Sequence, residues 1–221
     1  FDKLLRASRP DRIVILGDTN SGLAAIVAAR AGIPVFHLEA GNRCYDNRVP
    51  EEVNRRIIDH SSTVLMPYTH RSKDNLVREG VDRTRIFVTG NPIFEVLEAN
   101  REAIDKSDVL DRLKLQSKKF FLVTLHRAEN VNEEERLKGI LAGLSRVQST
   151  HQQPMVVSLH PHTADRMKAF GLSTERSDIR FLTPLGFFDF VRLEKEARCV
   201  LSDSGTVQEE GENTSRFRTC I

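Results

Sequence analysis

The sequence is poor in cysteine, lacks tryptophan and contains no apolar run longer than a β-strand. Its three cysteines, Cys44, Cys199 and Cys220, lie far apart and form no Cys-x-x-Cys pair, which argues against a disulfide framework and a zinc-ligand pattern. The longest apolar runs, RIVILG and KKFFLVTLH, are too short to span a membrane, and the opening FDKLLRASRPDR lacks the apolar core of a signal peptide. We expect a cytoplasmic protein without a membrane segment or a metal site.

An excess of charge of one sign is also absent. The 33 Lys and Arg residues nearly balance 31 Asp and Glu residues, which gives a formal net charge of +2. A chain this close to neutrality has no overall charge that would favour nucleic acid or an anionic membrane as a partner, although acidic small molecules remain possible ligands. Its 221 residues suffice for one large domain or two small ones.

Short apolar, β-branched runs alternate with helical segments through most of the chain. The expected strands are 12–17, 34–39, 63–68, 85–90, 120–126, 154–160, 179–184 and 198–203. These runs show no alternation of polar and apolar residues, which is typical of a parallel sheet covered on both faces by helices. The pattern predicts an α/β protein with doubly wound parallel sheets.

The alternation breaks once, where residues 91–119 are charged and helical with no strand among them. Such a segment joins two folding units more readily than it crosses one sheet. We therefore predict part of a first Rossmann-like domain in residues 1–94, a helical connection in 95–117 and a second Rossmann-like domain in 118–221.

Polar residues that follow the apolar runs are candidate site residues, because ligands of open α/β sheets lie beyond the carboxyl ends of the strands. Asp18 follows the first run and could either cap the next helix or serve a site. His37 and Glu39 end the second run, where strand alternation places both side chains on the same side. A carboxyl group beside so apolar a segment should have a raised pKa, which suits Glu39 to act as a general acid.

The segment VPEEVNRRIID predicts a helix that begins near Pro50. Helical spacing puts Glu51 and Arg55 on one face, and Val53 and Ile57 on the opposite, core-facing one. The helix N-terminus favours an ionised Glu51, which suits a general base. The alternative is that Glu51 and Arg55 form an ordinary surface ion pair.

Basic residues follow two strands of the second half. His126 and Arg127 end one predicted strand, and His160 ends another. This pattern fits an anion site, although a single histidine at a strand end often has only a structural role.

A turn of small residues follows the last predicted strand. The backbone N–H groups of Ser204 and Gly205 could bind phosphate there, and Glu210 on the next helix could accept hydrogen bonds from a ribose. The alternative is a helix cap with acidic residues in its first turn. Carboxylates in the first half and phosphate and sugar ligands in the second indicate a nucleotide-sugar as the ligand.

Six motifs, in this order, closely resemble the non-hydrolysing UDP-N-acetylglucosamine 2-epimerases of bacteria and archaea: GDTNS, HLEAGNR, VPEEVNRRIIDH, RIFVTGNP, VTLHRAEN and SDSGTVQEE. The resemblance implies two Rossmann-like domains of the GT-B type that face each other across a cleft, and usually a homodimer. It also implies epimerisation at C2 of a UDP-sugar by elimination and re-addition of UDP, with no redox cofactor and no required metal. This chemistry needs acid and base groups on both faces of the sugar and cations at the diphosphate.

The same resemblance implies roles for single residues. The matches to catalytic positions are Asp18, Glu39, Glu51 and His126. The matches to substrate-binding positions are Arg55, Arg127, His160, Ser204, Gly205 and Glu210. Asp18, Glu39 and Glu51 would be the acid and base carboxylates, while Arg55 and His126 would hold the leaving UDP. Ser204 and Glu210 would bind its phosphate and ribose, and Arg127 and His160 match contacts to a second, activating UDP-sugar in some bacterial members.

Two departures from the family pattern bear on the fold. Family members begin with a glycine-rich strand and loop that carries G-T-R-P-E and a phosphate-binding arginine, which this sequence does not show, and the resemblance stops near Gly211. We therefore expect both domains to be truncated, with Ile13 and Ile15 partly uncovered at a sheet edge. Weak binding of UDP and slow turnover should follow.

A third departure bears on the substrate. The segment EAGNRCYDNRVPEE resembles the subgroup that acts on modified sugars, such as UDP-2,3-diacetamido uronates or the 6-deoxy precursors of N-acetylfucosamine. The expected substrate is a UDP-N-acetylamino sugar, either UDP-N-acetylglucosamine or one of these relatives. Two alternatives remain open: a GT-B glycosyltransferase, which needs an acceptor, and a non-catalytic module that binds a nucleotide-sugar.

Overall fold

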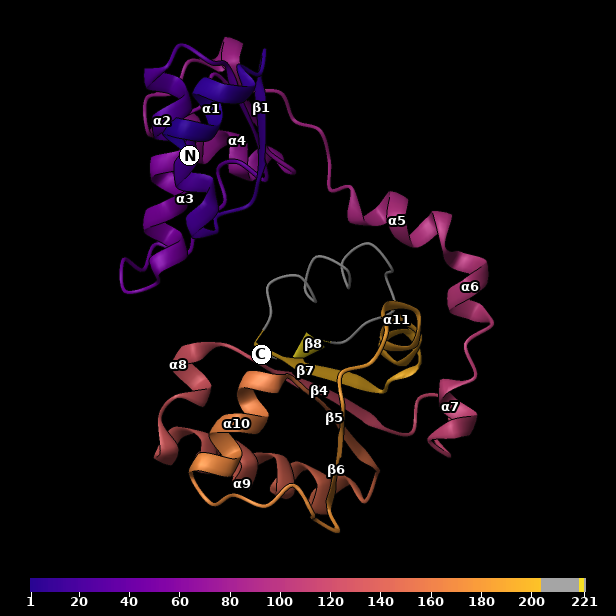
Figure 1. The fold of residues 1–221 in the computed structure, drawn as a ribbon. Coiled ribbons are helices and arrows are strands. Elements are labelled where there is room, and N and C mark those ends of the chain that lie inside the picture. The colour runs from indigo at the N-terminus through magenta and orange to yellow at the C-terminus, as the bar shows by residue number, and fades with distance from the viewer. Residues whose placement is uncertain (204–218, 221) are drawn as a thin grey trace. The chain divides into compact units, whose positions relative to one another are not determined.

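A computed structural model describes residues 1–203 and 219–220, which fold into two compact units that divide between Pro92 and Ile93 (Figure 1). Each unit has its own sheet, and all pairs of named strands are parallel. The predicted α/β class with parallel sheets is therefore confirmed.

The first unit contains a three-stranded sheet and the helices that connect its strands. Its elements in chain order are α1 (Asp2–Ser8), β1 (Ile13–Leu16), η1 (Asn20–Leu23), α2 (Ala24–Arg30), β2 (Val35–Leu38), α3 (Pro50–Ser61), β3 (Val64–Met66), α4 (His70–Arg78) and η2 (Arg83–Arg85). The strands pair in the order β1-β2-β3. Because the strands are parallel, their carboxyl ends lie along one edge of the sheet, where the polar segments begin.

The helices of the first unit pack on one face of this sheet. Ile15 packs with Ile58 of α3, and Leu65 packs with Leu76 of α4. The strand register pairs Ile15 with His37 and His37 with Leu65, so these three side chains point to the same face. The core of the first unit therefore lies on that side.

The other face of β1 is exposed in the part of the chain that the structure describes. Val14 and Leu16 are 64% and 63% exposed, whereas Ile15 is buried and Ile13 is half-buried. The expectation of uncovered side chains at positions 13 and 15 is therefore wrong for Ile15, because it points into the helical layer. The expectation of helices on both faces of the sheet is not met in the first unit over the described residues.

The second unit contains a five-stranded sheet in the order β6-β5-β4-β7-β8. Its elements in chain order are α5 (Ile93–Ala99), α6 (Arg101–Asp105), α7 (Val109–Arg112), β4 (Phe121–Leu125), α8 (Ala128–Val131), α9 (Glu134–His151), β5 (Met155–Leu159), α10 (Pro161–Ala169), β6 (Ile179–Leu182), α11 (Phe187–Glu196), β7 (Cys199–Ser202) and β8 (Thr219–Cys220). Over the described residues, no helix of either unit is long and apolar enough to cross a membrane.

Helices cover both faces of the second sheet, as the apolar strands predicted (Figure 1). Val123 of β4 packs against Leu137 and Leu141 of α9. Leu122, the preceding residue of β4, packs against Leu193 of α11 on the opposite face. Successive strand residues point to opposite faces, so a strand between two helical layers is apolar at most positions on both sides.

The predicted strand at 85–90 is not a strand in the structure. Arg83–Arg85 form the short helix η2, and Ile86 makes only an isolated parallel bridge to Leu65. Phe87 and Thr89 continue alongside β3 by donating backbone hydrogen bonds to Leu65 and Pro67. The segment is extended as its β-branched composition predicted, but its backbone makes too few ladder bonds to form a regular strand.

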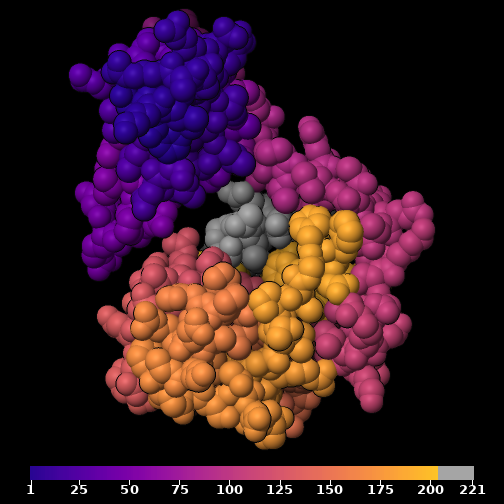
Figure 2. Space-filling view, in the orientation of Figure 1, coloured from indigo at the N-terminus to yellow at the C-terminus, as the bar shows by residue number. Residues whose placement is uncertain are grey.

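The charged segment between the two sheets is helical, and it packs on α11. Ile104 of α6 and Val191 of α11 share an apolar cluster, and Lys195 lies 2.8 Å from Asp105. Figure 2 shows the surface of α5 to α7, in magenta, adjoining the amber surface of α11. These helices therefore belong to the second unit.

We expect Leu65→Ala to lower the free energy of unfolding of the first unit by about 2–5 kcal/mol, because Leu65 is fully buried and its removal leaves a cavity. The matched control is Leu16→Ala, at an exposed position of the same sheet, which should change it by less than about 0.5 kcal/mol. Urea denaturation followed by circular dichroism measures both values. Equal losses in the two variants would contradict the assignment of the core to one face of the sheet.

Candidate active site

Asp18 and Arg55 come together at the carboxyl edge of the first sheet. Gly17, with a φ of 75°, turns the chain after β1, and Asp18 follows it. An Nη of Arg55, from the middle of α3, lies 2.6 Å from Oδ2 of Asp18, and the side chains are 16% and 24% exposed. The Asp18 side chain therefore forms an ion pair, and the following helix η1, whose N-cap is Thr19, has no side-chain cap.

Glu39 lies next to the Gly17 turn. Its Oε2 would be 3.5 Å from a Cβ atom at Gly17, and its Oε1 accepts a hydrogen bond of 3.2 Å from Asn42. Glu39 has a left-handed φ of 68°, just beyond the last residue of β2. Strand alternation therefore ends at Leu38 and does not extend to Glu39, while His37 is buried beneath the turn.

Helix α3 begins at Pro50 as predicted, but the prediction of its buried face was wrong. Val53 is 43% exposed and Ile57 is half-buried. The buried residues of α3 are Glu52, Asn54, Ile58 and Asp59. Three of these four residues are polar, and each has hydrogen-bond partners outside α3. The sequence alone does not show that these partners lie beside the helix.

The two neighbouring glutamates of α3 differ in their surroundings. Glu51 is exposed, whereas Glu52 is fully buried. Glu52 accepts hydrogen bonds from the backbone N–H groups of Cys44 and Tyr45, at 3.0 and 3.2 Å, and lies 3.3 Å from Arg55. Burial alone would raise the pKa of Glu52, but these contacts and that with Arg56 lower it.

In the second unit, Asp203 accepts several hydrogen bonds from the segment that follows β4. Its carboxylate accepts hydrogen bonds from the backbone N–H groups of His126 and Arg127, at 3.2 and 3.0 Å, and from the Asn130 side chain at 3.0 Å. The Nδ1 atom of His126 lies 3.2 Å from the same carboxylate. Asp203 therefore fixes both the backbone and the ring of His126.

This pairing shifts the pKa values of Asp203 and His126 so that the charged form of each is favoured. Burial alone would raise the pKa of Asp203, but the hydrogen bonds from His126, Asn130 and two backbone amides hold it at about 2. The hydrogen bond to Asp203 raises the pKa of His126, against the opposing effect of burial. His126 is 43% exposed, so the imidazolium can meet an anionic ligand.

The other predicted residues of the second unit have separate surroundings. The ring of His160 lies 6.4 Å from that of His126, and its Nδ1 accepts a hydrogen bond from the backbone N–H of His162, which caps α10. Arg127 donates to the backbone carbonyl of Asp203 at 2.6 Å and lies 3.5 Å from Glu129. Ser204, Gly205 and Glu210 lie outside the described residues. Within residues 1–203, no three His, Cys, Asp or Glu side chains gather into a possible metal site.

A sequence profile described as UDP-N-acetylglucosamine 2-epimerase matches residues 1–215. The chain belongs to this family.

Individual members of this epimerase family are similar to the chain in sequence and in structure. The UDP-N-acetylglucosamine 2-epimerase of Methanocaldococcus jannaschii is 40% identical over 217 residues, covering 95% of this chain and 59% of that enzyme. A crystal structure of the M. jannaschii epimerase in complex with UDP-GlcNAc and UDP has a TM-score of 0.91 at 39% identity, covering 99% of this chain and 61% of that one. The UDP-2,3-diacetamido-2,3-dideoxy-D-glucuronate 2-epimerase of Pseudomonas aeruginosa is 32% identical over 211 residues, covering 95% of this chain and 58% of that enzyme. The chain thus spans about 59% of the length of these curated relatives.

Reasoning from the sequence found the motifs of the epimerase family but missed the residues that support them. Glu52 and Asp59 are buried polar residues of α3, and Arg43 is a cation with a buried side chain that pairs with Asp59. The signal that could have found them is the polar stripe of Glu52, Arg55, Arg56 and Asp59, which has the helical spacing of a buried face.

We expect Glu52→Gln to lower the free energy of unfolding by about 3–5 kcal/mol, because it removes a buried charge on which two arginines and two backbone amides depend. Glu51→Gln, one residue away and exposed, should change it by less than about 0.5 kcal/mol. Chemical denaturation of the two variants gives the comparison. Similar losses would contradict the structural role of Glu52.

We expect Asp203→Asn to lower the pKa of His126, because it removes the contact that raises it. Glu129→Gln, which removes a weaker charge effect on the same ring, should lower it less. Titration of the His126 ring by NMR measures both shifts. An unchanged pKa in Asp203→Asn would contradict the pairing.

The same pair makes stability depend on pH. Because the folded pKa of His126 is raised, its contribution to stability should be complete below about pH 6.5, the ordinary histidine pKa, and lost as pH rises through the folded pKa.

Proposed function

We propose that the protein inverts the configuration at C2 of a UDP-N-acetylamino sugar by eliminating and re-adding UDP. A base removes the C2 proton, the electron pair forms a double bond between C1 and C2, and the C1–O bond to UDP breaks. Return of a proton to the opposite face of C2, with return of UDP to C1, completes the epimerisation. The observation that carries the proposal is the pair of carboxylates, Asp18 and Glu39, held beside the Gly17 turn in a chain of this family.

The carboxylates of the first unit supply the proton transfers in this proposal. Glu39 lies beside the Gly17 turn, and Glu51 is exposed in the first turn of α3. These are the properties expected of groups that exchange protons with a substrate and with water. Arg55 remains a proposed ligand of the leaving UDP, and its ion pair with Asp18 also fixes that carboxylate.

The second unit supplies a cation for the leaving group. His126, with its pKa raised by Asp203, presents a partly exposed imidazolium at the end of β4, which suits it to stabilise the diphosphate of departing UDP. Ser204, Gly205 and Glu210 remain the proposed phosphate and ribose ligands. Arg127 and His160 remain proposed contacts to a second UDP-sugar.

The proposed substrate is UDP-N-acetylglucosamine or a 2,3-diacetamido or 6-deoxy relative of it. One similar structure holds UDP-GlcNAc and UDP, and another relative is named for a UDP-2,3-diacetamido uronate, so both kinds of sugar occur among the relatives. We also propose that the protein acts as a homodimer in the cytoplasm and needs no cofactor, as the family resemblance implies.

We expect the chain to incorporate deuterium at C2 when it is incubated with UDP-N-acetylglucosamine in D₂O, because the proton is removed and returned by groups that exchange with solvent. Each reversible removal labels the sugar, so NMR or mass spectrometry detects the reaction even at slow net turnover. Glu39→Gln and Glu51→Gln should each lower the rate about 10²- to 10⁴-fold.

The control for these variants is Asp46→Asn, which removes an exposed carboxylate that pairs with Arg48 in the loop before α3 and should keep the rate of the unmodified chain. Product without label would exclude the proton-transfer mechanism. An unchanged sugar and no label, with UDP bound, would favour the glycosyltransferase or binding-module alternatives. Full rate in both Gln variants would exclude these two carboxylates.

A further inference from the structure

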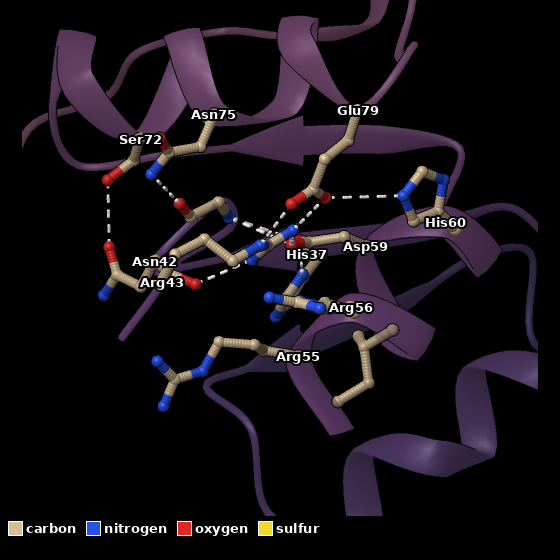
Figure 3. A network of polar contacts seen from close by, with 12 residues as sticks. His37, Asn42, Arg43, Arg55, Arg56, Asp59, His60, Ser72, Asn75 and Glu79 are labelled. Carbon is tan, nitrogen blue, oxygen red and sulfur yellow. Dashed lines mark hydrogen bonds and ion pairs between the residues drawn. The ribbon is translucent and has the colours of Figure 1, made fainter. Parts of the chain in front are cut away.

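A largely buried ion cluster is hydrogen-bonded to the turns that carry Asp18 and Glu39. Figure 3 shows its members His37, Arg43, Asp59 and Glu79. At its centre is Asp59, near the end of α3, whose side chain is completely removed from solvent. The Nδ1 atom of His37 lies 2.7 Å from Oδ1 of Asp59, and an Nη of Arg43 lies 2.8 Å from Oδ2. Burying these charges lowers the stability of the fold unless ion pairs and hydrogen bonds compensate for the lost hydration.

Both nitrogens of the His37 ring face oxygen atoms of the protein. Nδ1 faces the Asp59 carboxylate, and Nε2 lies 3.0 Å from the carbonyl oxygen of Gly17. A carbonyl and an ionised carboxylate only accept hydrogen bonds, whereas a neutral imidazole has a single N–H donor. Both contacts are satisfied only when both ring nitrogens carry a proton. Arg43, the second base beside Asp59, also pairs with Glu79, whose side chain is 26% exposed.

The cluster reaches both turns through hydrogen bonds. Asp59 accepts the backbone N–H of Gly41, two residues after Glu39, with both carboxylate oxygens at 3.3 and 3.2 Å. The His37 ring, which pairs with Asp59, also contacts the carbonyl oxygen of Gly17, the residue before Asp18.

The turn at Gly41 depends on a close approach as well as on this bond. A Cβ atom at position 41 would lie 2.3 Å from the carbonyl oxygen of Ser72, and its φ is 79°. One carboxylate therefore fixes two turns that belong to different strands.

We infer that Asp59 and His37 are positioning residues, which hold the turns of Asp18 and Glu39 in the arrangement that proton transfer at C2 requires. The inference rests on the proposed function, because it assigns the turns a role in that reaction. Neither residue touches the substrate in this scheme. They act by fixing the backbone on which the reacting carboxylates stand, where a displacement of about 1 Å can lower a rate about 10²-fold.

Glu79 of α4 offers a matched control within the same network. Its carboxylate pairs with Arg43, at 2.8 and 2.6 Å, and with His60 at 3.4 Å. These contacts reach neither the Gly17 turn nor the Gly41 N–H. Glu79→Gln therefore makes the same change of charge as Asp59→Asn, beside the same arginine, without removing the bonds to the turns.

The experiment begins with the unmodified 221-residue chain labelled with ¹⁵N-histidine. The nitrogen shifts of the His37 ring should show both nitrogens protonated in the folded chain. Hydrogen exchange should then be faster at residues 17–19 and 39–42 in Asp59→Asn, and unchanged there in Glu79→Gln. A singly protonated ring, or equal exchange in the two variants, would overturn the inference whether or not the chain is active.

The kinetic readout is C2 labelling in D₂O. Asp59→Asn should lower kcat by about 10²-fold with little change in KM, and Glu79→Gln should lower neither. An unmodified chain that gives no label would count against the proposed function, and the exchange data would still decide the positioning role.

Two variants at His37 keep the test sharp if Asp59→Asn does not fold. The amide of His37→Asn can replace Nδ1 towards Asp59, and that of His37→Gln can replace Nε2 towards Gly17. We expect His37→Gln to keep the Gly17 turn protected from exchange and to retain more of kcat than His37→Asn. The reverse order would show that the link to the Gly17 turn has no role.

Discussion

Two carboxylates of helix α3, Glu52 and Asp59, are completely removed from water, and the first unit depends on how their charges are compensated. Taking a carboxylate out of water costs several kcal/mol unless cations and N–H donors replace the lost hydration. Here the donors come from the segment that follows β2, at Gly41, Cys44 and Tyr45. The loop between β2 and α3 therefore takes its shape from the helix that it precedes.

The second unit contains a similar arrangement of a largely buried aspartate, backbone N–H donors and a histidine. Asp203 accepts backbone N–H groups after β4 and faces Nδ1 of His126, just as Asp59 accepts the N–H of Gly41 after β2 and faces Nδ1 of His37. The difference lies in burial. His37 is 1% exposed and can only link protein groups, whereas His126 is 43% exposed and can also meet a ligand. One arrangement thus serves as internal support in one unit and as a candidate binding group in the other.

The sequence predicted the elements better than it predicted their partners. Largely apolar strands such as β4 were recognisable because a strand between two helical layers is buried on both sides. The buried face of α3 was not, since Glu52 and Asp59 become favourable inside only when Arg43, Arg55 and distant backbone amides meet them. Asp18 and Glu39 could be proposed from their place after strands, but the Asp18–Arg55 pair joins residues 37 positions apart and no local pattern encodes it.

The left-handed backbone conformation of Glu39 lowers the stability of the fold at a position where we propose a catalytic carboxylate. A residue other than glycine at a φ of 68° stores roughly 1–2 kcal/mol of strain, which a glycine would release. Selection for a more stable fold alone would therefore favour glycine here, and would remove the carboxylate with it. Laboratory evolution of this chain for thermostability should therefore be screened for activity at this codon.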